Sequence, residues 1–141
     1  MKYHFRIHKE RAGYWAEGVE ISWANTQART RGELAANMKE VLELCLEEPE
    51  DSSRVLPLPD PGIKGRNIVE VSPDPKVALA AMVRRERMAH RLTQKAAAAR
   101  MGIRHLRQYQ RLESGKTANA VLETLARIKK AYPGFSLDAV F

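Results

Sequence analysis

Residues 87–116 of the chain read RMAHRLTQKAAAARMGIRHLRQYQRLESGK, and this stretch decides the expected fold of the second half. Thr93 belongs to the residue types that cap helix N-termini, and Gly102 to the type that most often follows a helix C-terminus. We therefore expect a short helix between these residues, a Met-Gly turn, and a second short helix over residues 104–113. Two short helices around a tight turn, the second rich in arginine, are typical of proteins that place a helix in a DNA groove.

The second expected helix has a basic face and an apolar face. At about 100° per residue, one face carries Arg104, Arg107, Gln108 and Arg111, and the other carries Leu106, Tyr109 and Leu112. Arginine pairs bidentately with guanine and glutamine with adenine, so the basic face suits the reading of base edges. A solvated helix face has a similar composition, but the adjoining turn favours DNA contact. His105 borders the apolar side, where it either packs or contacts a phosphate.

Arg87 and Glu113 are expected to form a structural ion pair. Glu113 falls on the inward side of the second helix, where an unpaired carboxylate is costly. A buried Arg87 partner would offset that cost and set the angle between the helices that carry the two residues. Two unrelated exposed charges are the alternative.

Charge is distributed unevenly along the chain. Residues 1–66 carry 10 Lys and Arg against 11 Asp and Glu, whereas residues 67–141 carry 14 against 6. A basic second half indicates a polyanionic partner. The step coincides with a proline-rich stretch, so we expect two domains, residues 1–72 and 73–141. Domains of about 70 residues bury little surface, which makes a homodimer or higher homo-oligomer the expected state.

The first half begins with strand patterns. Residues 2–9 alternate apolar side chains (Tyr3, Phe5, Ile7) with polar ones (His4, Arg6, His8), which predicts a half-buried strand. Residues 14–20 and 23–29 are expected to add two more strands, and residues 68–71 a last short one. His4 and His8 are expected on the solvent face, about 13 Å apart and too far from each other for one metal ion.

Helices complete the expected order of elements. Thr30 and Glu33 form the pattern of a capping box, so a helix should start there and end before Pro49. Its apolar stripe comprises Leu34, Met38, Val41, Leu42 and Cys45. In the second half, further helices are expected over residues 76–90 and 119–131. The inward side chains of the last helix are expected to be Val121, Leu122, Leu125 and Ile128.

Several classes of protein are disfavoured by what the chain lacks. The single cysteine, Cys45, excludes an intrachain disulfide and a cysteine-based zinc cluster. Paired carboxylates, a Ser/His/Asp set and a glycine-rich phosphate loop are not apparent, so we expect neither an enzyme nor a bound metal or cofactor. No run approaches the roughly 20 apolar residues of a membrane span. A cytoplasmic protein without a membrane partner is expected.

Two family resemblances together cover nearly the whole chain. The first half resembles the HicB antitoxin family in GYWAE (13–17), TQART (26–30), ELCLE (43–47) and LPLP (56–59). The second half resembles the Xre/Cro-type helix-turn-helix of phage repressors in LTQ (92–94), RMGI (100–103) and LESGK (112–116). The second motif is the more specific of the two.

The resemblances imply a fold and a set of site residues. They imply an α+β chain in which a truncated ribonuclease-H-like β-β-β-α-β domain precedes an all-α helix-turn-helix domain. In that family the first domain silences a HicA toxin, a small mRNA-cleaving ribonuclease, and the second represses the operon by binding operator DNA. Gln94 and Lys116 match phosphate-contacting positions. Arg107, Gln108 and Arg111 match base-reading positions, and Arg87 with Glu113 matches the structural ion pair.

The sequence therefore predicts a bifunctional antitoxin. A basic toxin would be attracted to the acidic residues of the first domain: Glu17, Glu20, Glu40, Glu43, Glu47 and Glu48. A glutamate stripe opposite an apolar stripe is more often only a solvated face. The alternative is a stand-alone Xre-type repressor whose first domain senses a ligand or oligomerises.

Overall fold

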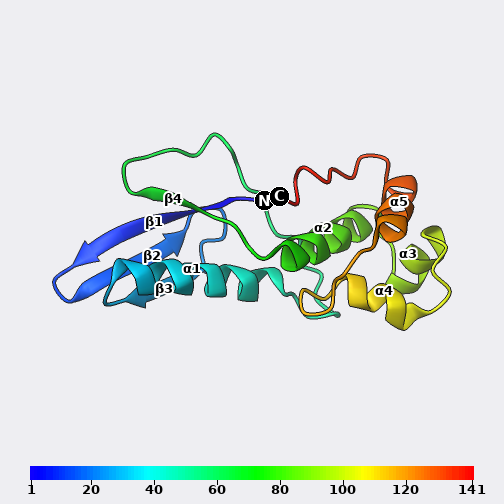
Figure 1. Ribbon diagram of the computed structural model, residues 1–141, viewed down its shortest axis with the longest axis horizontal. Coiled ribbons are helices and arrows are strands. Elements are labelled where there is room, and N and C mark those ends of the chain that lie inside the picture. The colour runs from blue at the N-terminus through cyan, green and yellow to red at the C-terminus, as the bar shows by residue number, and fades with distance from the viewer. The chain divides into compact units, whose positions relative to one another are not determined.

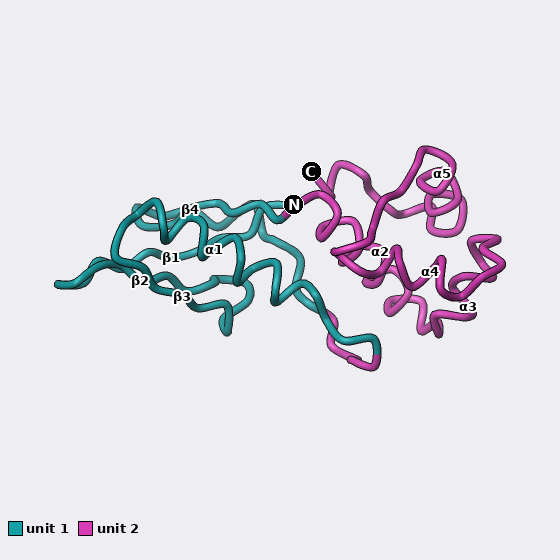
Figure 2. The backbone as a smooth tube through the Cα atoms, turned by 60° about the horizontal axis from the view of Figure 1, so that its bottom comes forward, with its two compact units in different colours: residues 1–50, 56–73 teal, residues 51–55, 74–141 magenta.

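The chain folds into an α+β structure with one four-stranded antiparallel sheet and five helices, so the expected class is confirmed. The computed structural model describes all of residues 1–141 and divides into two compact units (Figure 2). Unit 1 comprises Met1–Glu50 and Leu56–Pro73, and unit 2 comprises Asp51–Val55 and Asp74–Phe141. None of the helices has the length and apolar character needed to cross a membrane.

Unit 1 is built on the sheet. Its strands are β1 (Tyr3–Glu10), β2 (Gly13–Gly18), β3 (Asn25–Ala28) and β4 (Ile68–Val71), in the order β3-β2-β1-β4 (Figure 1). All neighbouring strands are antiparallel. The predicted alternation in β1 is confirmed on one face, where Tyr3, Phe5 and Ile7 are buried. Ala16 of β2 pairs with Ile7 and is buried on the same face.

Helix α1 (Arg31–Leu46) packs against this sheet, mainly along β3 and β2 (Figure 1). The predicted capping box is confirmed: the Thr30 hydroxyl accepts from the Glu33 backbone N–H at 3.2 Å, and the Glu33 carboxylate accepts from the Thr30 N–H at 3.3 Å. Of the predicted apolar stripe, Leu34, Met38 and Leu42 are buried, whereas Val41 and Cys45 are half-buried. The local pattern therefore gives both the start and the packed face of α1.

The expectation that His4 lies on the solvent face is wrong. His4 is 3% exposed, and its ring Nδ1 lies 2.6 Å from Oε1 of Glu20. The same carboxylate accepts from the backbone N–H of His4 at 2.9 Å and from that of Asp60 at 3.2 Å. Alternation along a strand indicates to which side a residue points, but not whether another segment covers that side. Here the chain after β2 returns and covers His4.

Unit 2 is helical apart from its connections. It contains α2 (Pro75–Ala89), α3 (Gln94–Arg100), α4 (Leu106–Leu112) and α5 (Leu122–Ala131) (Figure 1). Its largest fully buried side chains are Val83, Tyr109, Ile128, Tyr132 and Phe135. The predicted N-cap of α3 is confirmed, because the Thr93 hydroxyl accepts from the Ala96 N–H at 3.1 Å.

Two helices of unit 2 start later than the sequence predicts. Helix α4 begins at Leu106 rather than at residue 104, and Leu106 is 41% exposed instead of buried. Helix α5 begins at Leu122 rather than at residue 119. Val121 and Leu122 are 62% and 83% exposed, so the expectation that they face inward is wrong. Neither helix has a side-chain N-cap, so the sequence holds no local hydrogen-bond signal for their starts.

Residues 51–55 belong to unit 2, although they follow α1 in the chain. Arg84 of α2 is 7% exposed and donates from Nη1 to the Arg54 carbonyl at 2.9 Å and from Nη2 to the Ser52 carbonyl at 2.6 Å. Carbonyl oxygens thus satisfy two donors of a buried guanidinium. The proline-rich sequence around this segment does not indicate the attachment.

Candidate nucleic-acid interface

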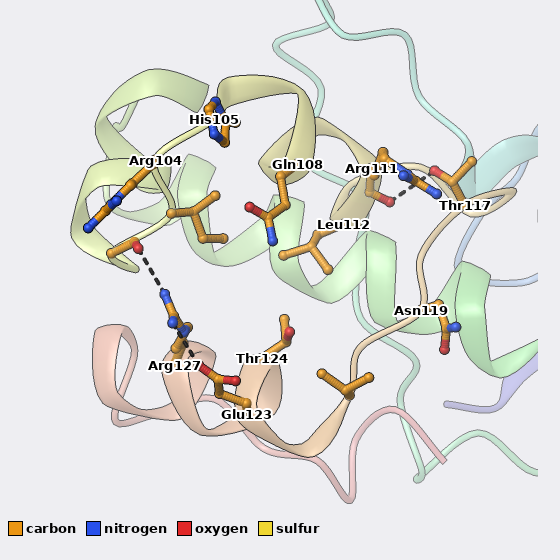
Figure 3. A pocket seen from close by; sticks show the side chains of 13 residues that line it. Arg104, His105, Gln108, Arg111, Leu112, Thr117, Asn119, Glu123, Thr124 and Arg127 are labelled. Carbon is orange, nitrogen blue, oxygen red and sulfur yellow. Dashed lines mark hydrogen bonds and ion pairs between the residues drawn. The ribbon is translucent and has the colours of Figure 1, made fainter.

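Unit 2 contains a groove of about 690 Å³ between α4 and α5 (Figure 3). One side is formed by the turn before α4 and by α4 itself, with Arg104, His105, Gln108 and Arg111. The other side is formed by the segment after α4 and by α5, with Thr117, Asn119, Glu123, Thr124 and Arg127. Three of the predicted DNA-binding residues, Arg104, Gln108 and Arg111, therefore line one groove.

The turn before α4 is set by Gly102. Its φ of +67° is left-handed, a conformation that glycine adopts at little cost and that commonly ends a helix. The N–H of Gly102 donates to the Ala99 carbonyl at 3.0 Å, and that of Ile103 to the Ala98 carbonyl at 2.8 Å. Ile103 is buried, so the chain leaves α3 anchored and places the exposed residues Arg104 and His105 at the groove. Arg104 thus lies before α4 and not on it, contrary to the predicted helix.

Helix α4 divides into a buried and an exposed side, with one exception. Tyr109 and Leu112 are buried, whereas Arg107, Gln108 and Arg111 are exposed. The exception is the exposed Leu106 described above. Arg107 is not part of the groove lining, and neither is Lys116 in the following segment. The Thr117 hydroxyl donates to the Arg111 carbonyl at 3.0 Å, which holds that segment at the end of α4.

The predicted ion pair between Arg87 and Glu113 is confirmed. Nε of Arg87 donates to Oε1 of Glu113 at 2.6 Å and Nη2 to Oε2 at 3.0 Å, and the side chains are 7% and 5% exposed. The Tyr109 hydroxyl donates to Oε1 at 2.7 Å and the Gln94 amide to Oε2 at 3.1 Å. One buried carboxylate thus accepts four hydrogen bonds from α2, α3 and α4, which fixes these helices relative to one another.

The pKa directions in this network follow from its geometry. The hydrogen bond to Glu113 raises the pKa of Arg87, although burial acts in the opposite sense. Burial raises the pKa of the Tyr109 hydroxyl, and the nearby negative charge of Glu113 raises it further. The network therefore places a charged guanidinium and a neutral phenol against the carboxyl group of Glu113.

Gln94, expected at a phosphate, has both ends of its amide in this network. Its Nε2 donates to Glu113, and its Oε1 accepts from the Gln110 side chain at 3.1 Å. Gln94 therefore joins the start of α3 to α4 within unit 2. Its phosphate contact stays a prediction.

Sequence reasoning did not find the side of the groove that α5 forms. The Glu123 carboxylate and Arg127 Nη2 lie 2.7 Å apart, an i, i+4 pair on the surface of α5. The spacing of these charges is visible in the sequence and signals a helical pair. Nothing local indicates that the pair faces Arg104 and His105 across a groove, because that depends on how α5 packs.

The acidic residues expected to bind a toxin do not form one surface of unit 1. Glu20 lies beyond the end of β2 at Gly18, and its side chain is 5% exposed and held against His4, so it adds no exposed negative charge. Glu17 lies on the face of the sheet opposite to the buried Ala16, where it contacts Arg6 at 3.6 Å and His8 at 3.1 Å. The remaining residues belong to α1 and the chain that follows it: Glu40, Glu43, Glu47 and Glu48.

The groove offers donors suited to a polyanion. The side chains of Arg104, Gln108 and Arg111 make no hydrogen bond or ion pair with the rest of the protein and are exposed. Guanidinium and amide groups of this kind bind phosphate oxygens and the edges of bases. Comparison with known proteins assigns no family to this arrangement: no family model matches the chain, and no curated protein matches it.

Proposed function

We propose that unit 2 binds double-stranded operator DNA through the groove and the exposed side of α4. The observation that carries the proposal is the set of unpaired donors on Arg104, Gln108 and Arg111 along one wall of the groove. The order of elements supports a helix-turn-helix, in which α3 is followed by a turn and by α4. In this proposal α4 is the helix that enters the major groove. The Arg87 and Glu113 network holds α4 rigid, which base reading requires.

The charge of the chain supports the same partner. Residues 67–141 have an excess of eight basic residues, whereas residues 1–66 have an excess of one acidic residue. Neutralisation of phosphates by lysine and arginine supplies most of the sequence-independent affinity for DNA. Arg107 and Lys116 lie outside the groove lining and are assigned to the flanking phosphates or bases in this proposal.

Unit 1, in this proposal, is the toxin-binding part of a HicB-like antitoxin that is not an enzyme. Its element order, β-β-β-α-β, supports the truncated ribonuclease-H-like description. The partner is a small basic HicA-like ribonuclease, which the acidic residues of α1, exposed at Glu40 and half-buried at Glu43 and Glu47, would attract. Sequestering this toxin and repressing its operon would then be carried out by different units of one chain.

A stand-alone repressor is the second candidate, and one observation favours it. At least three of the six acidic residues assigned to the toxin are engaged within unit 1: Glu20 is buried against His4, Glu17 lies beside Arg6 and His8, and Glu43 lies 3.8 Å from Lys39. If unit 1 does not bind a toxin, its proposed role is to sense a ligand or to form the oligomer.

Selection of duplexes from a random DNA pool tests the proposed function. We expect the full chain to enrich a two-fold symmetric sequence with half-sites about 34 Å apart, because such motifs read DNA as dimers. Sedimentation with the enriched duplex should give two chains per duplex. The absence of any enriched sequence would contradict DNA reading, and one chain per symmetric site would contradict dimeric binding.

Charge reversal on α1 tests toxin binding. Glu43→Lys together with Glu47→Lys should slow association of the full chain with a HicA-like ribonuclease by about tenfold, with a smaller effect at high salt. Glu10→Lys, at an exposed end of β1, is the control for changing charge in unit 1. Stopped-flow association kinetics provide the measurement. Equal rates for the α1 variant and the wild type would remove the acidic side of α1 from the interface.

A further inference from the structure

Arg127 connects α5 to the turn that precedes α4. Its Nη1 donates to the Gly102 carbonyl at 2.8 Å, across 25 residues of sequence (Figure 3). Gly102 is the left-handed residue of this turn and lies two positions before Arg104. The hydrogen bond thus joins one wall of the groove to the start of the other.

The second terminal nitrogen of the Arg127 guanidinium also donates a hydrogen bond. Nη2 of Arg127 donates to Oε1 of Glu123 at 2.7 Å, one helical turn earlier on α5 (Figure 3). The carboxylate orients the planar guanidinium and pairs with its charge, with the Arg127 and Glu123 side chains 43% and 73% exposed. Arg104 on the opposite wall has no such partner. The two arginines line the same groove, but only Arg104 has an unopposed charge and free donors.

A second arginine attaches the C-terminal end of α5, one helical turn after Arg127. Nε of Arg100, the last residue of α3, donates to the Ala131 carbonyl at 2.9 Å, and its guanidinium lies 5.1 Å from the centre of the Tyr132 ring. Helix α5 is therefore tied to α3 and to the following turn at two separate points. Loss of the Arg127 hydrogen bond would release the point beside the groove and leave the other in place.

We infer that Arg127 is a positioning residue for the DNA-binding groove, holding the α3–α4 turn (residues 101–105) so that Arg104 and His105 meet DNA in a defined orientation. The inference rests on the proposed DNA binding of unit 2. A cation that contacts a phosphate releases counterions, and its removal lowers the slope of affinity against salt by about one. A cation neutralised within the protein contributes to orientation instead, so its removal should leave that slope unchanged.

The experiment compares Arg127→Met and Arg127→Lys with a matched control, Lys130→Met, in the full chain. For Arg127→Met we expect operator affinity to fall about tenfold, the effect of losing one hydrogen bond from a charged donor, while affinity for unrelated DNA and the salt slope stay unchanged. Arg127→Lys keeps the charge without the planar fork and should show the same loss of specificity. Lys130→Met removes one positive charge from α5 outside the groove lining and should keep the wild-type preference for the operator. Wild-type operator affinity in Arg127→Lys would overturn the inference. So would an Arg127→Met variant that loses affinity equally for all DNA and has a salt slope lowered by about one.

Hydrogen exchange in the free protein provides a readout that needs no DNA. The amides of Gly102 and Ile103 donate to carbonyls of α3, so their exchange reports on the turn. Both should exchange faster in Arg127→Met than in wild type and remain protected in Lys130→Met. Unchanged exchange in Arg127→Met would overturn the positioning role. A third outcome is faster exchange in Arg127→Met while the wild type prefers no DNA sequence. That outcome would support the contact between Arg127 and the turn but refute the proposed function.

Discussion

Replacing Glu113 with alanine should lower the free energy of unfolding of unit 2 by about 3–5 kcal/mol, the typical cost of breaking a buried ion pair from one side. The substitution leaves the guanidinium of Arg87, 7% exposed, without its carboxylate. It also removes the acceptor of the Tyr109 hydroxyl and the Gln94 amide. The double change Arg87→Met with Glu113→Leu should cost less than the two single changes added together, because no charge is then buried alone.

The two units allow this effect to be assigned within the full chain. Both tryptophans, Trp15 and Trp23, belong to unit 1, so their fluorescence follows that unit alone. Four of the five helices belong to unit 2, so circular dichroism at helical wavelengths mainly follows unit 2. Denaturation of the Glu113 variant should move the dichroism transition and leave the fluorescence transition in place. Strict additivity in the double-mutant cycle would show that the pair is not coupled.

Replacing Arg111 with alanine should weaken operator binding by about 1–3 kcal/mol and relax base preference at the position that it reads. Arg107→Ala is expected to act in the same way, because both side chains extend from the exposed side of α4. Lys116→Ala should instead weaken binding to all sequences alike and lower the salt slope by about one, as expected for a phosphate contact.

Titrations of the enriched operator and an unrelated duplex, each at several salt concentrations, distinguish these outcomes. Lys130→Ala is the matched control, since it removes one positive charge from α5 outside the groove lining. It should change neither the base preference nor the operator affinity beyond a small electrostatic effect. Protection of the operator by both arginine variants to the same extent as by wild type would refute the assignment of α4 as the reading helix.

The helix starts that the sequence predicts correctly depend on hydrogen bonds between near neighbours. The capping box joins Thr30 to Glu33 three positions later, and the Thr93 cap reaches Ala96 in the same way. Such bonds are decided by residue type and spacing, so they are visible without a fold. The late starts of α4 and α5 have no such bond, and at both starts the inward side was predicted wrongly.

One long-range contact is predictable, and another is not. Arg87 and Glu113 are 26 residues apart, yet an inward carboxylate on an otherwise apolar side requires a buried cation, and the packing of short helices supplies Arg87. His4 and Glu20 lie on segments whose alternation suggests exposure, and only the return of the chain after β2 buries them together.

The sequence by itself determines the α+β class, the caps of α1 and α3, the buried stripes of β1 and α1, and the concentration of positive charge in the second half. These follow from periodicity, local hydrogen bonding and composition, which act over a few residues or over whole segments. The tertiary structure alone decides the commitment of Gln94 to the Glu113 network and the groove that α5 completes with Arg127. Both arise where segments distant in sequence meet, and the geometry of such a meeting depends on how the complete set of side chains packs.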